Sequence, residues 1–591
     1  MGRVIFSIAL AAALLLATAT PRAQGPERFS GPSSQSILQI FDEYWEWKIA
    51  HRPELATQAG RREHNARWTD RSKAARDKDQ YDLREDLQRA MWFSPGTLTP
   101  AMRLSAYLLE ADIRDQIESE PYLPAIELVS QADGLHNRVF NVIDQMPADT
   151  RLDYENIVAR LLALPDYVDQ AIGQIQESVD AGLTQPAIVV DLMLDQLAAQ
   201  RGVPPLESPL LAAFQHFPDA VPPSAQRRLR AAAIDAYTRG FQTAWGRLET
   251  YLRGTYRPRA RTQAGLGSVP NGREAYARLI KHYTTTTMTP EQIHQLGLKE
   301  VARLEVEMQA IARDYGFTGT VQAFERELAD RPGMHFESQD EMLAYAEDVL
   351  ASVQPALPRL FSTLPRMKVG VRPIPADREA STASNYSVGT ADGSRQAWFN
   401  MNTYRPRDQT KYTIEALVLH ESVPGHHLQS ALAREMPGVP PFQRAFNAAA
   451  FGEGWALYAE SLGPELGVYR DPATRFGRLA SEYFRAVRLV VDTGIHSMGW
   501  TRERAREYFS SHVPSQSLAE VDRYIARPGQ ALAYKLGQLK ILELRERAQK
   551  ALGGRFDIKA FHQAVLRNGR LPLDLLEEEV DTYIAEARGR E

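Results

Sequence analysis

The sequence predicts a mainly α-helical fold. Apolar residues recur at helical spacing over residues 37–49, 101–117 and 154–179. Proline-containing breaks separate such segments at residues 95–100, 204–209 and 218–223. Patterns with the alternation of a strand are few beside them. We therefore expect a two-lobed, mainly helical fold, with a small β-hairpin or sheet beside the helix that carries most of the clustered histidines.

The first residues are typical of a secretory signal peptide. Arg3 precedes an almost unbroken apolar run over residues 4–17, and small residues recur up to Ala23. The run is too short for a spanning helix. We expect a signal peptide over residues 1–23, cleaved after Ala19 or Ala23, and a periplasmic or secreted protein without stable membrane insertion. An N-terminal anchor that stays in place is the alternative.

Composition narrows the function classes. The chain of 591 residues is 44% hydrophobic and 24% charged, with a net charge of −5, which is ordinary for a globular protein. A nucleic-acid-binding protein would need a basic face, and a protein held at an anionic membrane would need a polybasic patch. The net negative charge argues against the first class and gives no support for the second. The chain has no cysteine, which excludes a lipid on an N-terminal cysteine and fits an oxidising compartment.

Two lobes are expected along the mature chain. Residues 24–254 form the first, which ends in one long helix over residues 225–252 with Ser224 as its N-cap. A stretch rich in glycine and arginine, residues 253–273, is the junction. The second lobe covers residues 255–591. In it, Thr289, Pro290 and Gln292 form a capping-box pattern that begins a further helix.

One hairpin is expected, over residues 384–404. Asp392-Gly393 is a hairpin turn signal, and residues 385–389 and 396–403 flank it as candidate strands. In zinc peptidases a strand beside the metal helix pairs with the substrate backbone by strand addition. A hairpin that only covers the core is the alternative.

Residues 413–429 contain the closest cluster of possible metal ligands and catalytic groups in the sequence: His420, Glu421, His426 and His427. A zinc peptidase helix places two histidines four residues apart, with a glutamate beside the first that activates water. Here Pro424 occupies the place of the second histidine. In a regular helix six residues turn about 600°, and seven rise about 10 Å. Neither spacing fits two ligands of one tetrahedral ion.

Pro424 changes this geometry. In a helix interior a proline clashes with the carbonyl four residues back, here that of His420, and the following Gly425 tolerates unusual dihedral angles. A bulge is therefore expected. A bulge of two residues returns His426 to the ligand position, and one of three selects His427. We favour His426 and expect His427 beside the ligands or facing the substrate.

A third ligand is available in residues 445–463. Glu453 lies there among small and apolar residues, where an unpaired carboxylate would be costly to bury. Glu460, seven residues on, falls near the same helical face and could orient a histidine ligand. His420, His426 and Glu453 would then hold one zinc ion with its fourth position open, as in catalytic sites.

Glu421 would act as the general base towards water. The oxyanion that forms needs a donor besides zinc. Candidates are Tyr524 and Tyr534, and Arg523 could bind an anion or a substrate carboxylate. Arg523, Lys535 or Arg395 would favour a free C-terminus.

Four motifs carry a family likeness: HESVPGHHLQ, FGEGWALYAE, RLVVDTGIHSMGW and PGQALAYKLG. With them, nearly the whole mature chain resembles the bacterial domain-of-unknown-function 885 family. More distantly it is similar to the zinc oligopeptidases of the angiotensin-converting-enzyme and carboxypeptidase Taq type, which are helical with a deep channel between two lobes.

By that resemblance His420 and His426 match the motif histidines, Glu421 the base and Glu453 the third ligand. The Arg523-Tyr524 pair is similar to the arginine and oxyanion-stabilising tyrosine of converting enzyme. Tyr534 resembles the tyrosine of the YxLG motif of the Taq type. The two extra residues between the histidines depart from the pattern, and dipeptidyl peptidase III tolerates one.

The sequence thus favours a zinc metallopeptidase, a carboxypeptidase or oligopeptidase, that acts on short peptides. Two alternatives stay open. One is a helical peptide-binding protein with a non-catalytic metal site. The other is a metal-dependent amidase that acts on cell-wall peptides. The sequence does not define the substrate, the choice between exo- and endopeptidase, or the oligomeric state.

Overall fold

Helices make up most of the structure, a computed structural model that describes residues 34–92, 96, 98–375, 379, 382–393 and 395–589. The expected signal peptide over residues 1–23 lies outside the described residues. Within them, no helix combines the length and the apolar character needed to span a bilayer.

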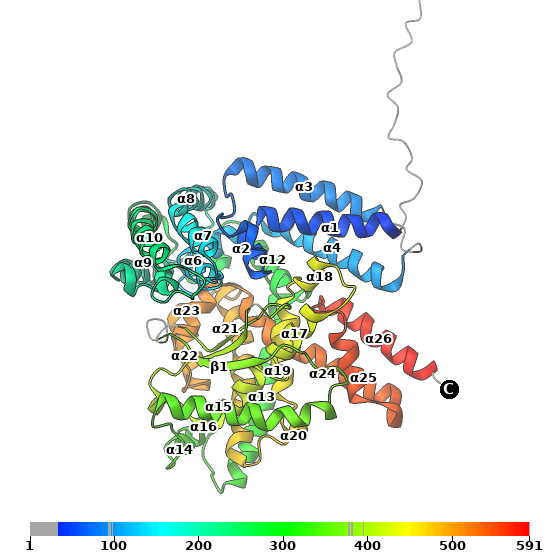
Figure 1. The fold of residues 1–591 in the computed structure, drawn as a ribbon. Helices are drawn as coiled ribbons and strands as arrows, with labels where there is room; N and C mark the ends of the chain where they lie inside the picture. Colours follow the sequence, from blue (N-terminus) through cyan, green and yellow to red (C-terminus); the bar gives the residue numbers. More distant parts are fainter. Residues whose placement is uncertain are drawn as a thin grey trace, which may run out of the picture.

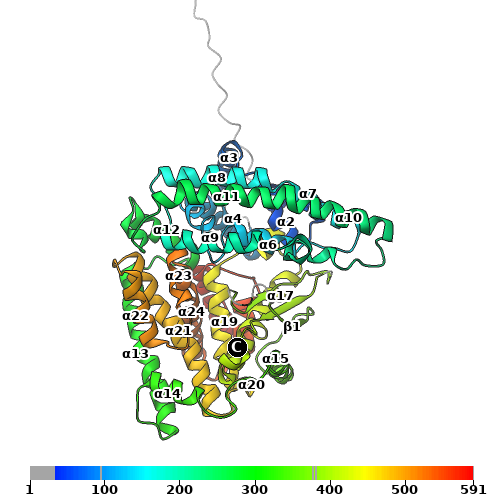
Figure 2. The same ribbon diagram turned by 90° about the vertical axis from the view of Figure 1, so that its left-hand side faces the viewer.

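The helices of the N-terminal half gather in an upper layer in both views (Figures 1 and 2). They are α1 (Ser34–His51), α2 (Pro53–Gln58), α3 (Lys73–Met91), α4 (Pro100–Ser119), α5 (Leu123–Glu127), α6 (Leu135–Asp144), α7 (Arg151–Leu162), α8 (Leu164–Asp180), α9 (Ala187–Arg201), α10 (Pro223–Ala236), α11 (Thr243–Tyr251) and α12 (Gly272–Thr284).

The remaining helices form the larger lower part (Figure 1). They are α13 (Pro290–Asp314), α14 (Val321–Ala329), α15 (Gln339–Val353), α16 (Lys411–Glu421), α17 (His426–Glu435), α18 (Pro441–Arg444), α19 (Ala449–Glu460), α20 (Gly463–Leu466), α21 (Pro472–His496), α22 (Arg502–His512), α23 (Ala519–Ala526), α24 (Ala533–Leu552), α25 (Ile558–Leu566) and α26 (Leu573–Gly589). In its middle, α19 packs against α24 and α16, and α21 packs against α13 and α16.

Of the two helix starts expected from capping residues, the one at Thr289 is confirmed and the one at Ser224 is not. Thr289 and Gln292 form the expected capping box at the start of α13. Ser224 is not the N-cap of α10, because the helix begins one residue earlier, at Pro223, whose fixed φ suits a first helical position. The expected long helix over residues 225–252 contains a π-helical segment, Tyr237–Gln242, between α10 and α11.

Two of the hydrophobic cores relate the upper layer to the lower part. Helices α6–α11 enclose a core of their own, from Leu128 to Tyr256. Helices α1 and α4 instead share a core with α16, α19 and α24 of the lower part. The separate core therefore ends close to the expected junction after residue 254. The division into lobes over 24–254 and 255–591, and the central channel between them, stay predictions.

A small sheet lies between α15 and α17 (Figure 2). The expected hairpin is present, since β2 (Asn385–Ser387) pairs antiparallel with β3 (Ala397–Met401). A third strand, β1 (Val369–Pro373), pairs parallel with β3, so the order is β1-β3-β2. Sequence reasoning missed β1, because no local turn signal marks a parallel partner. Beside α17, β2 is an edge strand of this sheet.

Candidate metal centre

The helix that carries the first histidine breaks where proline predicts. His420 and Glu421 are the last two residues of α16, and α17 begins at His426. Between them Ser422 and Gly425 have non-helical dihedral angles, and the Val423–Pro424 peptide bond is cis. The extra residues are therefore placed in a short connection between two helices.

Close approach explains why glycine stands in this connection. A Cβ atom on Gly425 would overlap the carbonyl oxygens of Leu419 and His420, so the start of α17 folds back directly onto the end of α16. The indole Nε1 of the buried Trp455 donates a hydrogen bond of 2.8 Å to the carbonyl oxygen of Pro424. Helix α19 thereby holds the connection in place.

The break brings the two histidine rings together. The ring centroids of His420 and His426 are 4.8 Å apart, and the ring planes are nearly perpendicular at 87°. One carboxylate oxygen faces both rings. Oε2 of Glu453 lies 3.8 Å from Nε2 of His420 and 3.3 Å from Nε2 of His426. Three possible ligand atoms thus converge from α16, α17 and α19.

Helix α19 reaches this position through a close crossing with α24. A Cβ atom on Gly454 would overlap the backbone of Gly537, and one on Gly537 would overlap the carbonyl of Ala450. The glycines at these positions let the two backbones touch. As a result Glu453, next to Gly454, and Tyr534, almost one turn before Gly537, lie on neighbouring helices at the same level.

Glu460 fixes the orientation of the first histidine. Its Oε1 lies 2.8 Å from Nδ1 of His420, and both side chains are buried. Burial by itself lowers the pKa of His420, but the carboxylates of Glu453 and Glu460 outweigh it and raise that pKa to about 9. The ring is therefore held between two carboxylates.

The carboxyl groups of Glu421 and Glu453 differ in the direction in which their pKa values are shifted. Burial raises the pKa of Glu421 above its usual value. Burial has the same tendency at Glu453, but His426 and His420 hold the pKa of that carboxyl well below its usual range. Glu421 lies near the rings, since ligand atoms of His420, Glu421 and His426 are all within 4.8 Å of one another. One carboxylate is paired with the histidines, and the other adjoins them.

His427 turns away from this centre. Its Nδ1 lies 3.1 Å from the hydroxyl of Tyr386 on β2, and its Nε2 lies 3.0 Å from the carbonyl oxygen of Met367. Burial lowers the pKa of His427 to about 4. Both ring nitrogens are occupied, so the connection presents His426, and not His427, to His420 and Glu453.

The structure places the two candidate tyrosines differently. The ring of Tyr534 lies 6.4 Å from that of His420 with the planes 16° apart, and its hydroxyl has no hydrogen-bond partner among the described residues. The hydroxyl of Tyr524 is buried, donates to Glu520 at 2.8 Å and accepts from Arg488 at 3.0 Å. Tyr534 is thus the tyrosine brought beside the histidines.

The cationic candidates from the sequence are already bonded. Arg523 donates to Glu520 and to Gln530. The buried Lys535 donates to Glu482 at 2.6 Å and to Gln538 at 2.8 Å. The remaining candidate, Arg395, donates to three backbone carbonyl oxygens. In this arrangement these bonds occupy donors that a substrate carboxylate would need.

Sequence reasoning missed Arg434 and Arg570, which lie near the centre. Arg570 donates to Gln429 and Ser430 of α17, and its guanidinium lies against Gly452, the residue before Glu453. Arg434 shares α17 with His426. No local sequence pattern marks either arginine.

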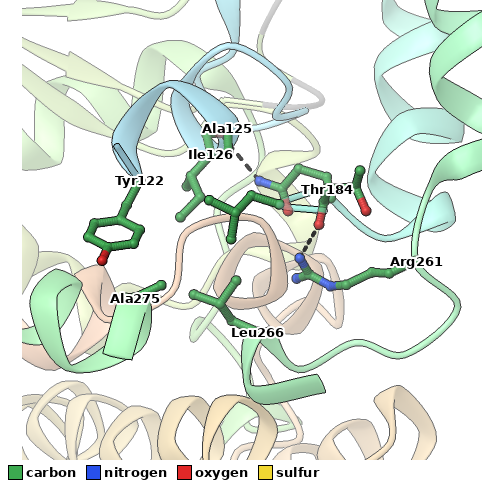
Figure 3. A pocket seen from close by; sticks show the side chains of 9 residues that line it. Tyr122, Ala125, Ile126, Thr184, Arg261, Leu266 and Ala275 are labelled. Atoms are coloured by element: carbon green, nitrogen blue, oxygen red, sulfur yellow. Dashed lines mark hydrogen bonds between the residues drawn. The ribbon is translucent and has the colours of Figure 1, made fainter. Parts of the chain in front are cut away.

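Away from this centre, a cavity of about 10 Å³ lies where α5 and α12 meet (Figure 3). Ile126, Leu266 and Ala275 contribute to its lining, and Arg261 and Gln185 supply polar groups. It has room for about one water molecule. It is therefore too small for a substrate.

Two solved structures cover almost the whole chain. The "putative lipoprotein from Colwellia psychrerythraea" is 26% identical, with a TM-score of 0.90 over 94% of this chain and 100% of its own. A "putative lipoprotein of unknown function from Shewanella oneidensis" is 18% identical, with a TM-score of 0.68 over 93% of this chain and 99% of its own. These likenesses agree with the observed fold.

A third structure is more remote. It is the "putative oligoendopeptidase F from Bacillus anthracis str. Ames", 12% identical over 86% of this chain and 95% of its own, with a TM-score of 0.33. A TM-score that low does not establish a common fold. No curated protein matches the sequence. The family model of bacterial proteins of unknown function DUF885 matches residues 53–580, and the chain belongs to that family.

Proposed function

We propose that the protein is a zinc-dependent peptidase that hydrolyses peptide bonds in short peptides. One observation carries the proposal. The Nε2 atoms of His420 and His426 lie 3.8 and 3.3 Å from Oε2 of Glu453. Ligand atoms about 2.0–2.1 Å from a tetrahedral zinc ion are about 3.4 Å from one another, so both distances to Glu453 are close to those between ligands that share one ion.

The chemistry of the donors supports the same metal. Two imidazole nitrogens and one carboxylate oxygen form a ligand set that zinc takes in catalytic sites, where a fourth position stays open. Glu460 would hold the Nε2 lone pair of His420 towards the ion. When bound, zinc would supply a Lewis acid that polarises the peptide carbonyl and activates water.

The surrounding residues would perform the proton transfers. Glu421 would accept a proton from the attacking water and deliver it to the amine that leaves. The hydroxyl of Tyr534, which is not committed to another described residue, would donate to the developing oxyanion. Tyr524 and Arg523 would support Tyr534 indirectly. Both donate to Glu520, and Tyr524 also bonds Arg488, which lies 4.6 Å from the ring centroid of Tyr534.

An extended substrate would add to the small sheet. Because β2 is an edge strand, its outer backbone groups are available for pairing with another strand. Tyr386, in the middle of β2, contacts His427 of α17. A peptide on this edge would run alongside the helix that carries His426.

We further propose a periplasmic or secreted location. The apolar run over residues 4–17 favours export, and relatives of the chain carry the description quoted above as lipoproteins. The chain itself has no cysteine that could carry a lipid. Export by a cleaved signal peptide therefore accounts for its sequence better than a lipid anchor.

A digest of a peptide library by the zinc-loaded protein, read by mass spectrometry, tests the activity. Glu421→Gln is the control, because it removes the proton acceptor and leaves the three ligands. We expect cleavage of short peptides by the wild type, and metal and peptide binding without turnover in the variant. Binding without cleavage by the wild type would favour the peptide-binding alternative. Cleavage restricted to cell-wall peptides would favour the amidase.

A further inference from the structure

An arginine cluster lies along α17, beside the candidate metal centre. Arg434 is four residues after Ser430 and seven after His427, so the three side chains lie on one face of the helix. Ser430 accepts a hydrogen bond from Arg570 at 3.3 Å, and His427 contacts Tyr386 at 3.1 Å. Arg434 therefore extends the surface formed by Arg570 and Tyr386.

Arg434 differs from its neighbours in that no described residue bonds it. Arg570 donates to three side-chain oxygens and Arg395 to three backbone carbonyls. Among the described residues, Arg434 has neither a hydrogen bond nor an ion pair, although it is only partly exposed. Five guanidinium donors are thus left to solvent or to a ligand.

The charges around Arg434 favour an anion there. Burial, together with the charges of Arg395 and Arg570, lowers the pKa of Arg434 to about 10. The nearest acid on its own helix, Glu435, is bonded to the backbone N–H of Met367 at 2.7 Å and to Arg366 at 3.3 Å. An unpaired buried charge is costly, whereas a carboxylate forms strong bidentate bonds with a guanidinium.

The cluster lies within a short peptide's reach of the metal ligands. Arg570 lies against Gly452, which precedes Glu453. Eight residues of helix separate His426 from Arg434, a rise of about 12 Å, and helical side chains lean back towards the N-terminus. Two extended residues span about 7 Å. The backward lean of the Arg434 side chain covers part of the difference, so a carboxylate about two residues from the cleaved bond would come within reach of its guanidinium.

We infer that Arg434, supported by Arg570 and Tyr386, binds a carboxylate of the peptide substrate within two residues of the cleaved bond. The inference rests on the proposed peptidase function and names its substrate class. That carboxylate has two possible sources, a free C-terminus and an acidic side chain. Arg434 is then a specificity-determining residue, on the helix that carries the ligand His426.

The test compares three N-blocked peptides of one sequence. The first has a free C-terminus, the second a C-terminal amide, and the third a C-terminal amide with glutamate as its last residue. For the zinc-loaded wild type we expect kcat/KM at least about tenfold higher for the first peptide than for the second. A similar rate for the third identifies an acidic side chain as an equal source.

Variants locate the effect. Arg434→Gln should abolish the preference, and Arg434→Lys, which keeps the charge, should restore part of it. Arg366→Gln is the matched control, because it removes the same charge from a largely exposed arginine bonded to Glu435. It should leave the preference unchanged. If Arg434→Gln fails to fold, Arg434→Lys decides: a preference for the acid smaller than that of the wild type supports the inference, and an unchanged preference contradicts it.

Binding separates this inference from the proposed activity. Calorimetry on Glu421→Gln should give tighter binding of the acid than of the amide, and the difference should be lost when Arg434→Gln is added. Wild type that cleaves acid and amide within twofold of each other, or a preference that survives Arg434→Gln, overturns the inference. Wild type that cleaves neither peptide but binds the acid more tightly overturns the peptidase proposal alone.

Discussion

Nδ1 of His420 lies 2.8 Å from Oε1 of Glu460, forty residues further along the chain. A carboxylate can only accept a hydrogen bond, so Nδ1 carries a proton, and Nε2 is the nitrogen that could bind a metal ion in place of its own proton. Nε2 is on the side of Glu453, 3.8 Å from its Oε2. Glu460, the last residue of α19, therefore fixes the tautomer in which His420 could bind a metal.

Glu460→Gln tests this orienting role. The amide keeps the size of the side chain but removes its charge, so we expect zinc affinity to fall about 10- to 100-fold. Competition with a chelator of known affinity measures it. Glu465→Gln is the control, because Glu465 bonds Arg545 nearer the surface. Equal affinity in Glu460→Gln and wild type would mean that this carboxylate does not tune the site.

Gly425→Ala tests the connection between α16 and α17. The added methyl group would overlap two carbonyl oxygens, so α17 must shift away from His420. We expect a lower melting temperature and loss of bound zinc. Gly173→Ala in α8, where nothing lies within 4 Å of the added carbon, is the control and should be neutral or stabilising. Full zinc content in Gly425→Ala would contradict the account of the break.

Tyr534→Phe and Tyr524→Phe separate the two tyrosines. Tyr534 lies beside His420 with a hydroxyl that bonds no other described residue, so loss of this hydroxyl should lower kcat about 100-fold or more while KM changes little. Tyr524 is bonded to Glu520 and Arg488, so its loss should lower the melting temperature and change kcat only a few-fold. Steady-state kinetics and thermal unfolding of both variants check this. The reverse pattern would assign the oxyanion donor to Tyr524.

His562 should make stability depend on pH. Its ring is buried, lies 2.9 Å from the carbonyl oxygen of Leu360 and 2.8 Å from the hydroxyl of Tyr458, and burial lowers its pKa to about 3. The unfolded value is about 6.5. Between these two pH values the unfolded chain binds a proton at His562 that the folded chain does not bind. The contribution of His562 to the free energy of unfolding is therefore complete above about pH 6.5 and falls as pH falls.

The variant His562→Gln isolates this effect. Below about pH 6 the free energy of unfolding of the wild type should fall by about 1.4 kcal/mol per pH unit more than that of the variant. Urea unfolding at pH 7 and at pH 5 measures the difference. Parallel losses in the two proteins would show that His562 does not become protonated on unfolding.

Local signals in the sequence predicted much of this structure. Pro424 and Gly425 predicted the helix break, and Asp392-Gly393 predicted the hairpin, because each acts through its own backbone. The capping box at Thr289 is local in the same way. Counting residues across the break left both His426 and His427 open, and His426 was favoured because it follows Gly425; its role as a metal ligand stays a prediction.

Features that depend on distant segments were not predictable in this way. Strand β1 pairs in parallel with β3, and no local signal marks that pairing. The crossing of α19 and α24 depends on Gly454 and Gly537, which lie far apart in the sequence. Arg434 is distinguished only by the partners that it lacks, and those are known only from the fold.

The metal content of the purified protein tests the central claim most directly. Protein prepared without added metal is measured by inductively coupled plasma mass spectrometry, beside His420→Ala and the control His512→Ala, whose histidine lies at the end of α22. We predict one zinc ion per chain in the wild type and in the control, and its loss in His420→Ala. Wild type without metal, or zinc that survives in His420→Ala, would contradict the account.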